Sequence, residues 1–314
     1  MVAATLAIEL LLMNCIGIWI RKSGTVSENF ANQLTGMVMK FCIPCLIFCS
    51  VSGAGEFSLE ALKNCGLVIV LAVGTLALSF AIGQVIYLAT GKSGVGRVMR
   101  YGLIFSHFSF MGIPVIAALF GDQGTFYYSF FLIPVRIAYY AFSESLMTPP
   151  GAAGQKRSAG EIVRGVALNP SMIALVLGLV FWVGGWQLPG AVSSCVKSLS
   201  GMCSPLALML CGMVIAEYDI RKLLRAKYLL LPLLRTAAMP ALFFLISRLL
   251  LLAGVERLLC NILVAFAALP VAALLPMYAV KYDPDPENQL NAAAASVISA
   301  ILCVVTIPLW SLVL

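Results

Sequence analysis

Apolar segments long enough to cross a lipid bilayer recur along the entire chain, and short polar connections separate them. A transmembrane helix needs about 20 apolar residues to cross a hydrocarbon core of about 30 Å. The segments run over residues 2–20, 33–53, 65–90, 98–120, 123–147, 170–187, 194–216, 228–253, 259–280 and 289–313. The pattern predicts an all-α integral membrane protein with ten transmembrane helices and no soluble domain of useful size.

The composition excludes an ordinary soluble domain, because 61% of the residues are hydrophobic, 11% are charged and the mean hydropathy is +1.02. The ten cysteines suggest disulfides only by their number. Cys42, Cys45 and Cys49 lie at helical spacing in an apolar stretch, far in sequence from the single histidine. We interpret them as small buried hydrophobic residues and expect neither a cofactor nor a metal.

Lysine and arginine are distributed unevenly between alternate connections. One set of connections contains thirteen of them: Arg21, Lys22, Lys92, Arg97, Arg100, Lys156, Arg157, Arg164, Arg221, Lys222, Arg225, Lys227 and Lys281. The other set contains four: Lys63, Lys197, Arg248 and Arg257. The positive-inside rule predicts that the first set faces the cytoplasm and that both termini are extracytoplasmic, in a multi-pass protein of the cytoplasmic membrane. The basic residues are dispersed over short loops, so the net charge of +7 indicates topology and no nucleic-acid partner is expected.

Two pairs of residues with the same separation in sequence indicate an internal repeat. Gly17 and Gly178 are separated by 161 positions, and so are Pro44 and Pro205. Five spans in each repeat force the second repeat to enter the membrane from the opposite side, which predicts two inverted repeats. The repeats are residues 1–147 and 170–314, joined by a cytoplasmic linker over residues 148–169 whose second half is either an amphipathic helix or a plain tether.

Two segments containing proline occupy matching places in the repeats, Ile113-Pro114-Val115 and Leu269-Pro270-Val271, separated by 156 positions at their prolines. Proline inside a membrane helix frees backbone groups that lipid cannot pair, so such breaks line cavities. Interrupted spans in both halves of a chain indicate a substrate site at the membrane midplane. Half-helix N-termini there favour a carboxylate, and unwound carbonyls can bind a cation such as sodium.

Several motifs resemble the auxin efflux carrier family. The strongest is His107-Phe108-Ser109-Phe110-Met111-Gly112-Ile113-Pro114 followed by Leu119-Phe120-Gly121-Asp122-Gln123-Gly124, which resembles the fourth span and the turn after it. The others are Phe41-Cys42-Ile43-Pro44, Asn169-Pro170, Ser204-Pro205-Leu206-Ala207-Leu208 with Gly212, and Ala267-Ala268-Leu269-Pro270. Together, the resemblance that these motifs carry extends over essentially the whole chain.

The resemblance implies a fold like that of bile-acid symporters and sodium/proton antiporters, with spans four and nine crossing at their breaks. Spans one, two, six and seven would form a scaffold, and spans three to five and eight to ten a moving transport domain. It further implies a homodimeric, elevator-type secondary carrier for a small organic anion such as a malonate-like dicarboxylate. Coupling to Na⁺ or H⁺ is left open.

The candidate substrate-binding residues come from the two breaks and one buried cation: His107, Gly112, Pro114, Arg136, Leu269, Pro270 and Val271. The candidates for coupling or support are Lys40, Glu144, Asn291, Ser296 and Ser299. His107 stands where many family members carry asparagine, and it is interpreted as a substrate contact, a proton carrier or a neutral structural histidine. Arg235, like Lys40, is expected to extend to an interface, because it lies about two turns from the end of its span.

Other classes of function remain possible at this stage. A channel or a non-transporting membrane sensor built on the same fold is the main alternative. An intramembrane enzyme is disfavoured because no nucleophile–base pair or metal-binding motif is present, and ATP-driven transport is disfavoured because there is no Walker-type glycine loop.

Overall fold

The computed structural model describes the chain except for residues 1, 28, 56–57, 150–157, 217–222 and 224. The described residues fold into helices, and their only strand-like pairing is an isolated antiparallel bridge. Five helical stretches are long and apolar enough to cross a membrane, or six if the bent pair Ala159–Ala167 and Pro170–Gly184 is one span. The protein is therefore a multi-pass membrane protein, and the count of ten spans stays a prediction.

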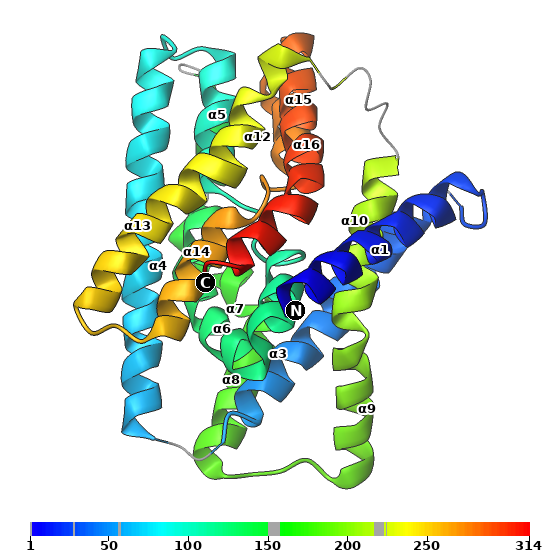
Figure 1. Cartoon of the computed structure of the whole chain (residues 1–314), viewed down its shortest axis with the longest axis vertical. Coiled ribbons are helices and arrows are strands. Elements are labelled where there is room, and N and C mark those ends of the chain that lie inside the picture. The colour runs from blue at the N-terminus through cyan, green and yellow to red at the C-terminus, as the bar shows by residue number, and fades with distance from the viewer. Residues whose placement is uncertain (1, 28, 56–57, 150–157, 217–222, 224) are drawn as a thin grey trace. The chain divides into compact units, whose positions relative to one another are not determined.

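The chain divides into two compact units. Unit 1 comprises residues 1–70, 109–133 and 164–217, and unit 2 comprises residues 71–108, 134–163 and 218–314. Two helices run from one unit into the other: α4 (Leu59–Ala89) and α6 (Gly112–Met147). The remaining helices of unit 1, drawn in Figure 1, are α1 (Val2–Lys22), α2 (Phe30–Met37), the π-helix η1 (Val38–Cys42), α3 (Ile43–Ser52), α8 (Pro170–Gly184), α9 (Gly190–Gly201) and α10 (Cys203–Ala216).

Helices of unit 1 pack through contacts that repeat along the sequence. A Cβ added at Gly17 of α1 would lie 2.0 Å from the carbonyl oxygen of Met209 on α10, so the two backbones touch there. Gly178 of α8 lies 161 positions after Gly17, and a Cβ added there would lie 3.4 Å from the carbonyl oxygen of Phe48 on α3, which lies 161 positions before Met209. Small residues let membrane helices approach this closely, and here they join α1 to α10 and α8 to α3.

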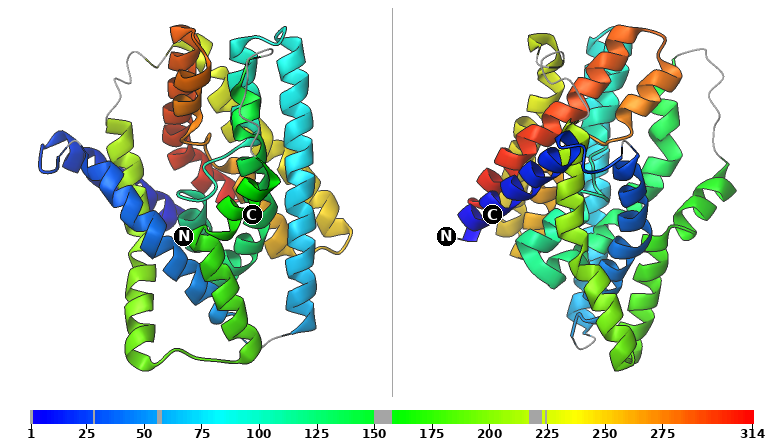
Figure 2. Two further views of the ribbon diagram at one scale, coloured as in Figure 1. Left: turned by 180° about the vertical axis from the view of Figure 1, so that it is seen from behind. Right: turned by 90° about the vertical axis from the view of Figure 1, so that its right-hand side faces the viewer.

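Unit 2 contains the rest of the chain. Besides parts of α4 and α6, its elements are α5 (Gly94–Ile104), the 3₁₀-helix η2 (Ala226–Tyr228), α12 (Leu230–Leu233), the π-helix η3 (Leu234–Ala238), α13 (Met239–Leu252), α14 (Arg257–Ala268), α15 (Leu275–Tyr282) and α16 (Pro286–Ser311). The views in Figure 2 show α15 and α16 side by side. Local sequence sets the helix starts: the side chains of Ser93 and Asp285 accept bonds from the amides of Gly96 and Glu287.

A single glycine separates the two parts of α6. Gly121 has φ 63° and ψ −155°, a backbone conformation that only glycine adopts readily. The predicted segments 98–120 and 123–147 meet at this residue, and the turn predicted from the Gly121-Asp122 motif is confirmed as a helix break.

The linker predicted over residues 148–169 falls partly outside the described residues, at 150–157. Its second half is helical, forming α7 (Ala159–Ala167). Asn169 then caps α8 by accepting a bond of 3.0 Å from the amide of Ser171, and α7 and α8 are bent by 62°. The helix rather than the plain tether is the correct interpretation of this half.

We predict that Gly212→Ala destabilises the protein by roughly 1–3 kcal/mol, because a Cβ there would lie 2.1 Å from the carbonyl oxygen of Asn14 and must push two backbones apart. The measurement is thermal unfolding of the purified protein in detergent. The control is Gly74→Ala on α4, where the added Cβ meets nothing within 4 Å. Equal melting temperatures for the two variants would show that the α1–α10 contact tolerates a side chain.

Candidate functional site

Two helices of the chain are interrupted at corresponding positions. The first interruption lies between the end of α5 at Ile104 and the start of α6 at Gly112, and the second lies between the end of α14 at Ala268 and the start of α15 at Leu275. The starts of α5 and α14 are separated by 163 positions, and so are the starts of α6 and α15. Each of the two segments thus contains a break between helices, and that each is one broken transmembrane span stays a prediction.

The position of the first interruption differs from the prediction. Pro114 lies in the first turn of α6, after the interruption, whereas Pro270 lies inside the second interruption. A proline in the first turn of a helix removes no intrahelical bond, so Pro114 begins a helix instead of breaking one. Pro276 likewise lies in the first turn of α15, so Pro114 and Pro270 occupy different places relative to the helices that follow them.

The unwound segments around Ser106 and Val271 pair with each other inside unit 2; we call this pairing the crossover. Ser106 and Val271 form an antiparallel bridge. The amide of His107 donates to the carbonyl of Pro270 at 2.8 Å, and the amide of Ala272 donates to the carbonyl of Phe105 at 3.2 Å. The amides of His107 and Ala272 are therefore already bound, because each has a backbone acceptor.

A buried arginine closes the C-terminal ends of both interrupted helices. Arg235 of η3 is 1% exposed. Its guanidinium donates to the carbonyl of Leu103 near the end of α5 at 2.8 Å, to that of Leu269 at 3.0 Å and to that of Phe266 at 3.4 Å. Helix ends leave carbonyls without intrahelical partners and carry partial negative charge, so one fixed cation satisfies both ends.

This placement corrects the expectation that Arg235 extends to an interface. The backbone next to Arg235 is also bound by a side chain. Pro240 has no amide hydrogen, and the carbonyl of Thr236 four residues earlier accepts a bond of 3.2 Å from the Trp310 indole. The helix is wider here, as a π-helix, at residues 234–238. Such turns often occur at functional sites.

The last helix supports the second interruption. The hydroxyl of Ser299 on α16 accepts a bond of 3.0 Å from the amide of Val271 and donates to the carbonyl of Ser296. The thiol of Cys303 lies 3.2 Å from the carbonyl of Ala268. Ser299 thus lies beside the interruption, as predicted, and acts on the backbone there.

One hydroxyl at the crossover has no partner among the described residues. Ser106 is 1% exposed, and its Oγ has no hydrogen bond in the part of the chain that the structure describes. A buried polar atom without a partner costs free energy and therefore needs an explanation. Sequence reasoning did not single out Ser106, because serine is common in membrane helices and only the bridge to Val271 brings this one to the crossover.

The other predicted residues are distributed over both units. His107 is partly buried next to Ser106, while Gly112 and Pro114 are buried at the start of α6 in unit 1. Arg136 is buried in the second part of α6, at 3% exposure. The structure thus brings together His107, Leu269, Pro270, Val271 and Ser299, and adds Ser106 and Arg235.

The candidates for coupling or support have different surroundings. Lys40 is exposed on η1, which agrees with the expectation that it extends away from the protein interior. Glu144 pairs with Lys281 at 3.5 Å. Asn291 is buried and Ser296 is partly buried on α16.

A buried ion pair joins α5 to the loop between α15 and α16. Arg97 donates to Asp283 at 2.8 Å, with side-chain exposures of 8% and 2%. The amide group of Asn288 lies 3.2 Å from each carboxylate oxygen of Asp283. Gly94 leaves room for this cluster, since a Cβ there would lie 2.0 Å from the Asn288 side-chain nitrogen. The cluster fixes α5, and hence the end of α5 at the crossover.

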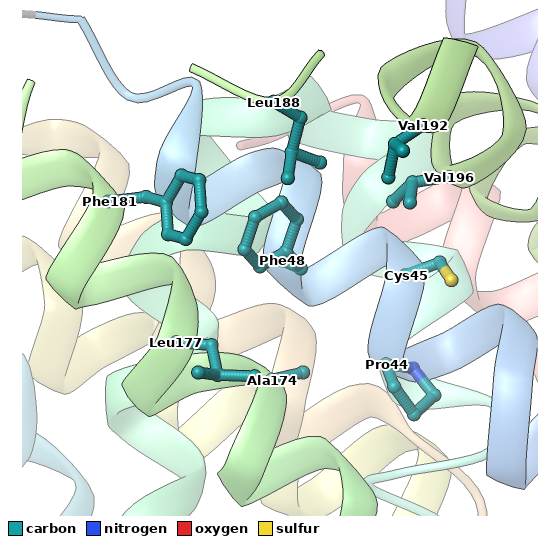
Figure 3. A pocket seen from close by; sticks show the side chains of 9 residues that line it. All are labelled: Pro44, Cys45, Phe48, Ala174, Leu177, Phe181, Leu188, Val192 and Val196. Carbon is teal, nitrogen blue, oxygen red and sulfur yellow. The ribbon is translucent and has the colours of Figure 1, made fainter. Parts of the chain in front are cut away.

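A separate apolar pocket of about 320 Å³ lies within unit 1 (Figure 3). Its lining residues come from α3, α8, α9 and the loop before α9: Pro44, Cys45, Phe48, Ala174, Leu177, Phe181, Leu188, Val192 and Val196. The rings of Phe48 and Phe181 meet edge to face at 5.3 Å. The lining side chains are apolar apart from the Cys45 thiol, which is a weak hydrogen-bond donor, so the pocket does not suit a carboxylate. Among the described residues, no group of three or more histidine, cysteine or acidic side chains could hold a metal ion.

These features define an all-helical, multi-pass membrane protein with breaks between its helices. The chain matches the membrane transport protein family over residues 2–311. It therefore belongs to that family, which is the family of the auxin efflux carriers, and the resemblance carried by the motifs is confirmed.

Two relatives cover nearly the whole chain. An uncharacterized transporter of Methanothermobacter thermautotrophicus is 28% identical over 98% of this chain and 97% of its own length. An uncharacterized transporter of Methanocaldococcus jannaschii is 23% identical over 100% of this chain and 99% of its own length. The family and these relatives identify the protein as a transporter and not an enzyme.

We predict that Asp283→Asn lowers the free energy of unfolding by roughly 3–5 kcal/mol, because it leaves the buried Arg97 without its counter-ion. The control is Lys281→Ala, which removes an exposed partner of Glu144 and costs about 0–1 kcal/mol. Thermal unfolding in detergent compares the two variants. A loss of stability in Asp283→Asn no greater than in the control would contradict a structural role for the pair.

Proposed function

We propose that this protein is a secondary carrier that moves a small organic anion, such as a mono- or dicarboxylate, across the cytoplasmic membrane. The observation that carries the proposal is the crossover, where two interrupted helices pair inside unit 2. Interrupted helices of this kind hold substrates in secondary transporters. The substrate site comprises Ser106, His107 and residues 269–272, with Ser299 supporting the backbone.

The charge at the crossover supports an anionic substrate. Arg235 supplies a fixed positive charge, and the nearby Ser106 hydroxyl is free to donate a bond to a carboxylate. The two observations together give the site a cation and a hydrogen-bond donor in a buried place, where electrostatic interactions are strong. His107 next to Ser106 is a further substrate contact or a proton carrier.

Inverted repeats and an elevator-type movement are part of the proposal. They are supported by the equal spacing of the interrupted helices and by the exchanged contact pairs Gly17–Met209 and Gly178–Phe48. The composition of the units supports it in part: α1–α3 and α8–α10 belong to unit 1 and α12–α16 belong to unit 2, whereas residues 109–133 and the start of α4, assigned to the transport domain, belong to unit 1. A homodimer with extracytoplasmic termini completes the proposal, on the family resemblance and the lysine and arginine distribution.

The proposal is tested by counterflow uptake in proteoliposomes with radiolabelled acetate, malonate, succinate and indole-3-acetate. A carrier gives saturable uptake that is accelerated by unlabelled substrate on the opposite side. Channel activity would give unitary currents without counterflow, and a sensor would bind an acid without moving it. Either result contradicts the carrier proposal.

We predict that Ser106→Ala lowers uptake roughly tenfold while leaving the melting temperature unchanged or higher, because it removes a buried hydroxyl that has no partner among the described residues. Ser299→Ala, in contrast, is expected to lower the free energy of unfolding by roughly 1–3 kcal/mol, because it removes the hydrogen-bond acceptor of the Val271 amide. If Ser106→Ala takes up substrate as fast as wild type, the Ser106 hydroxyl is not part of the substrate site.

A further inference from the structure

The apolar pocket of unit 1 lies among helices that belong to membrane-spanning stretches. Helices α3, α8 and α9 form it, together with the loop before α9. Helices α3 and α9 are parts of the candidate spans Phe30–Ser52 and Gly190–Ala216, and α8 is part of the bent pair that ends at Gly184. The medium around this pocket is therefore the hydrocarbon of the bilayer rather than water.

The pocket suits a hydrocarbon chain. Its volume of about 320 Å³ lies at the small end of ligand pockets, which measure roughly 300–1,000 Å³, so it accommodates part of a lipid and not a whole one. The rings of Phe48 and Phe181 meet in its wall at 5.3 Å. An empty apolar pocket leaves its lining without partner atoms, whereas a chain that fills it gains dispersion contacts with both rings.

A tryptophan indicates the level of the pocket in the membrane. Trp186 lies in the loop between α8 and α9, is 61% exposed, and its ring is 5.9 Å from that of Phe181. Exposed tryptophans are typical of the membrane–water interface. Figure 3 shows Leu188, from the same loop, at one end of the pocket and Ala174 at the other. The pocket thus extends from the headgroup level into the hydrocarbon, as an acyl chain does.

A positive charge lies beside the pocket. Lys197 follows the lining residue Val196 on α9 and is exposed. It lies close enough to Cys49 of α3 to interact with it electrostatically. The acid near the same cysteine is Asp122, which accepts a bond of 3.2 Å from the hydroxyl of Ser50. A lysine side chain is long enough to extend from a membrane helix to the headgroups, where it pairs with phosphate.

We propose that this pocket is a phospholipid site, in which one acyl chain fills the pocket and the lipid phosphate pairs with Lys197. Bilayer hydrocarbon is as apolar as the pocket, so the preference for the site comes from close packing and from the charge. The bound chain contacts α3, α8 and α9 together and stabilises their packing. The site belongs to unit 1 and does not depend on the proposed substrate.

The charge is tested by thermal unfolding of the purified protein in detergent micelles with one of two lipids. Dioleoyl phosphatidylglycerol carries a phosphate, and dioleoylglycerol has the same chains without it. Phosphatidylglycerol at about 100 times its Kd is expected to raise the melting temperature of wild type by about 5 °C, and dioleoylglycerol by less. Lys197→Gln is expected to remove the difference between the lipids. No stabilisation of wild type, or equal stabilisation by both lipids, would overturn the proposal.

The pocket itself is tested by a matched pair of substitutions on α8. Leu177 and Val176 are 50% and 55% exposed, and only Leu177 lines the pocket. Leu177→Trp is expected to fill the pocket and to lose most of the shift that phosphatidylglycerol causes, whereas Val176→Trp keeps that shift. Each variant is compared with itself in the absence of lipid, so a change in its own stability does not affect the result. The full shift in Leu177→Trp would overturn the proposal.

A labelling experiment on wild type needs no substitution. The thiol of Cys45 lines the pocket, and Cys15 on α1 is exposed outside it. Phosphatidylglycerol at about ten times its Kd is expected to slow the reaction of Cys45 with N-ethylmaleimide about tenfold and to leave Cys15 unchanged, as measured by peptide mass spectrometry. Equal labelling of Cys45 with and without lipid would overturn the proposal. Protection that follows protein concentration instead of lipid would assign the pocket to a second copy of the chain and would also overturn it.

Discussion

The structure around the crossover depends on one constraint, which is that backbone carbonyls at the end of a broken membrane helix must find donors inside the protein. Lipid offers none, and each unpaired group would cost several kcal/mol. Arg235 meets this constraint for α5 and α14 together, and the antiparallel pairing of Ser106 with Val271 provides further donors and acceptors. The two interrupted helices are thus joined through their backbones.

The surrounding helices hold this arrangement in place. The π-helix that carries Arg235 is followed by Pro240, and the carbonyl that this proline leaves free is bound by Trp310. Ser299 binds the backbone of the second interruption, and the Arg97–Asp283 pair fixes α5. The proposed substrate site would thus be pre-organised, because backbone bonds and buried side chains hold it, and this would lower the entropic cost of binding a small substrate.

The sequence predicted the helical class, the family and the existence of two interruptions, because long apolar segments and proline positions carry those signals. It misplaced the first interruption, since residues 105–111 contain neither glycine nor proline and only Pro114 beyond them attracted attention. It missed the role of Arg235 because the oxygens that it binds lie 132, 34 and 31 positions away. Ser106 gave no signal at all, since its lack of a partner is a property of the folded protein. The proposed substrate site therefore depends on contacts between residues far apart in the sequence, which a local pattern does not reveal.

The most direct measurement of the central claim is an experimental density map of the wild-type protein in sodium-containing buffer, at a resolution that shows side chains. We expect density for the Arg235 guanidinium between the carbonyls of Leu103 and Leu269, with the backbone unwound on both sides of it. A spherical cation in that place with the arginine turned away, or a continuous helix through residues 105–111, would contradict the account.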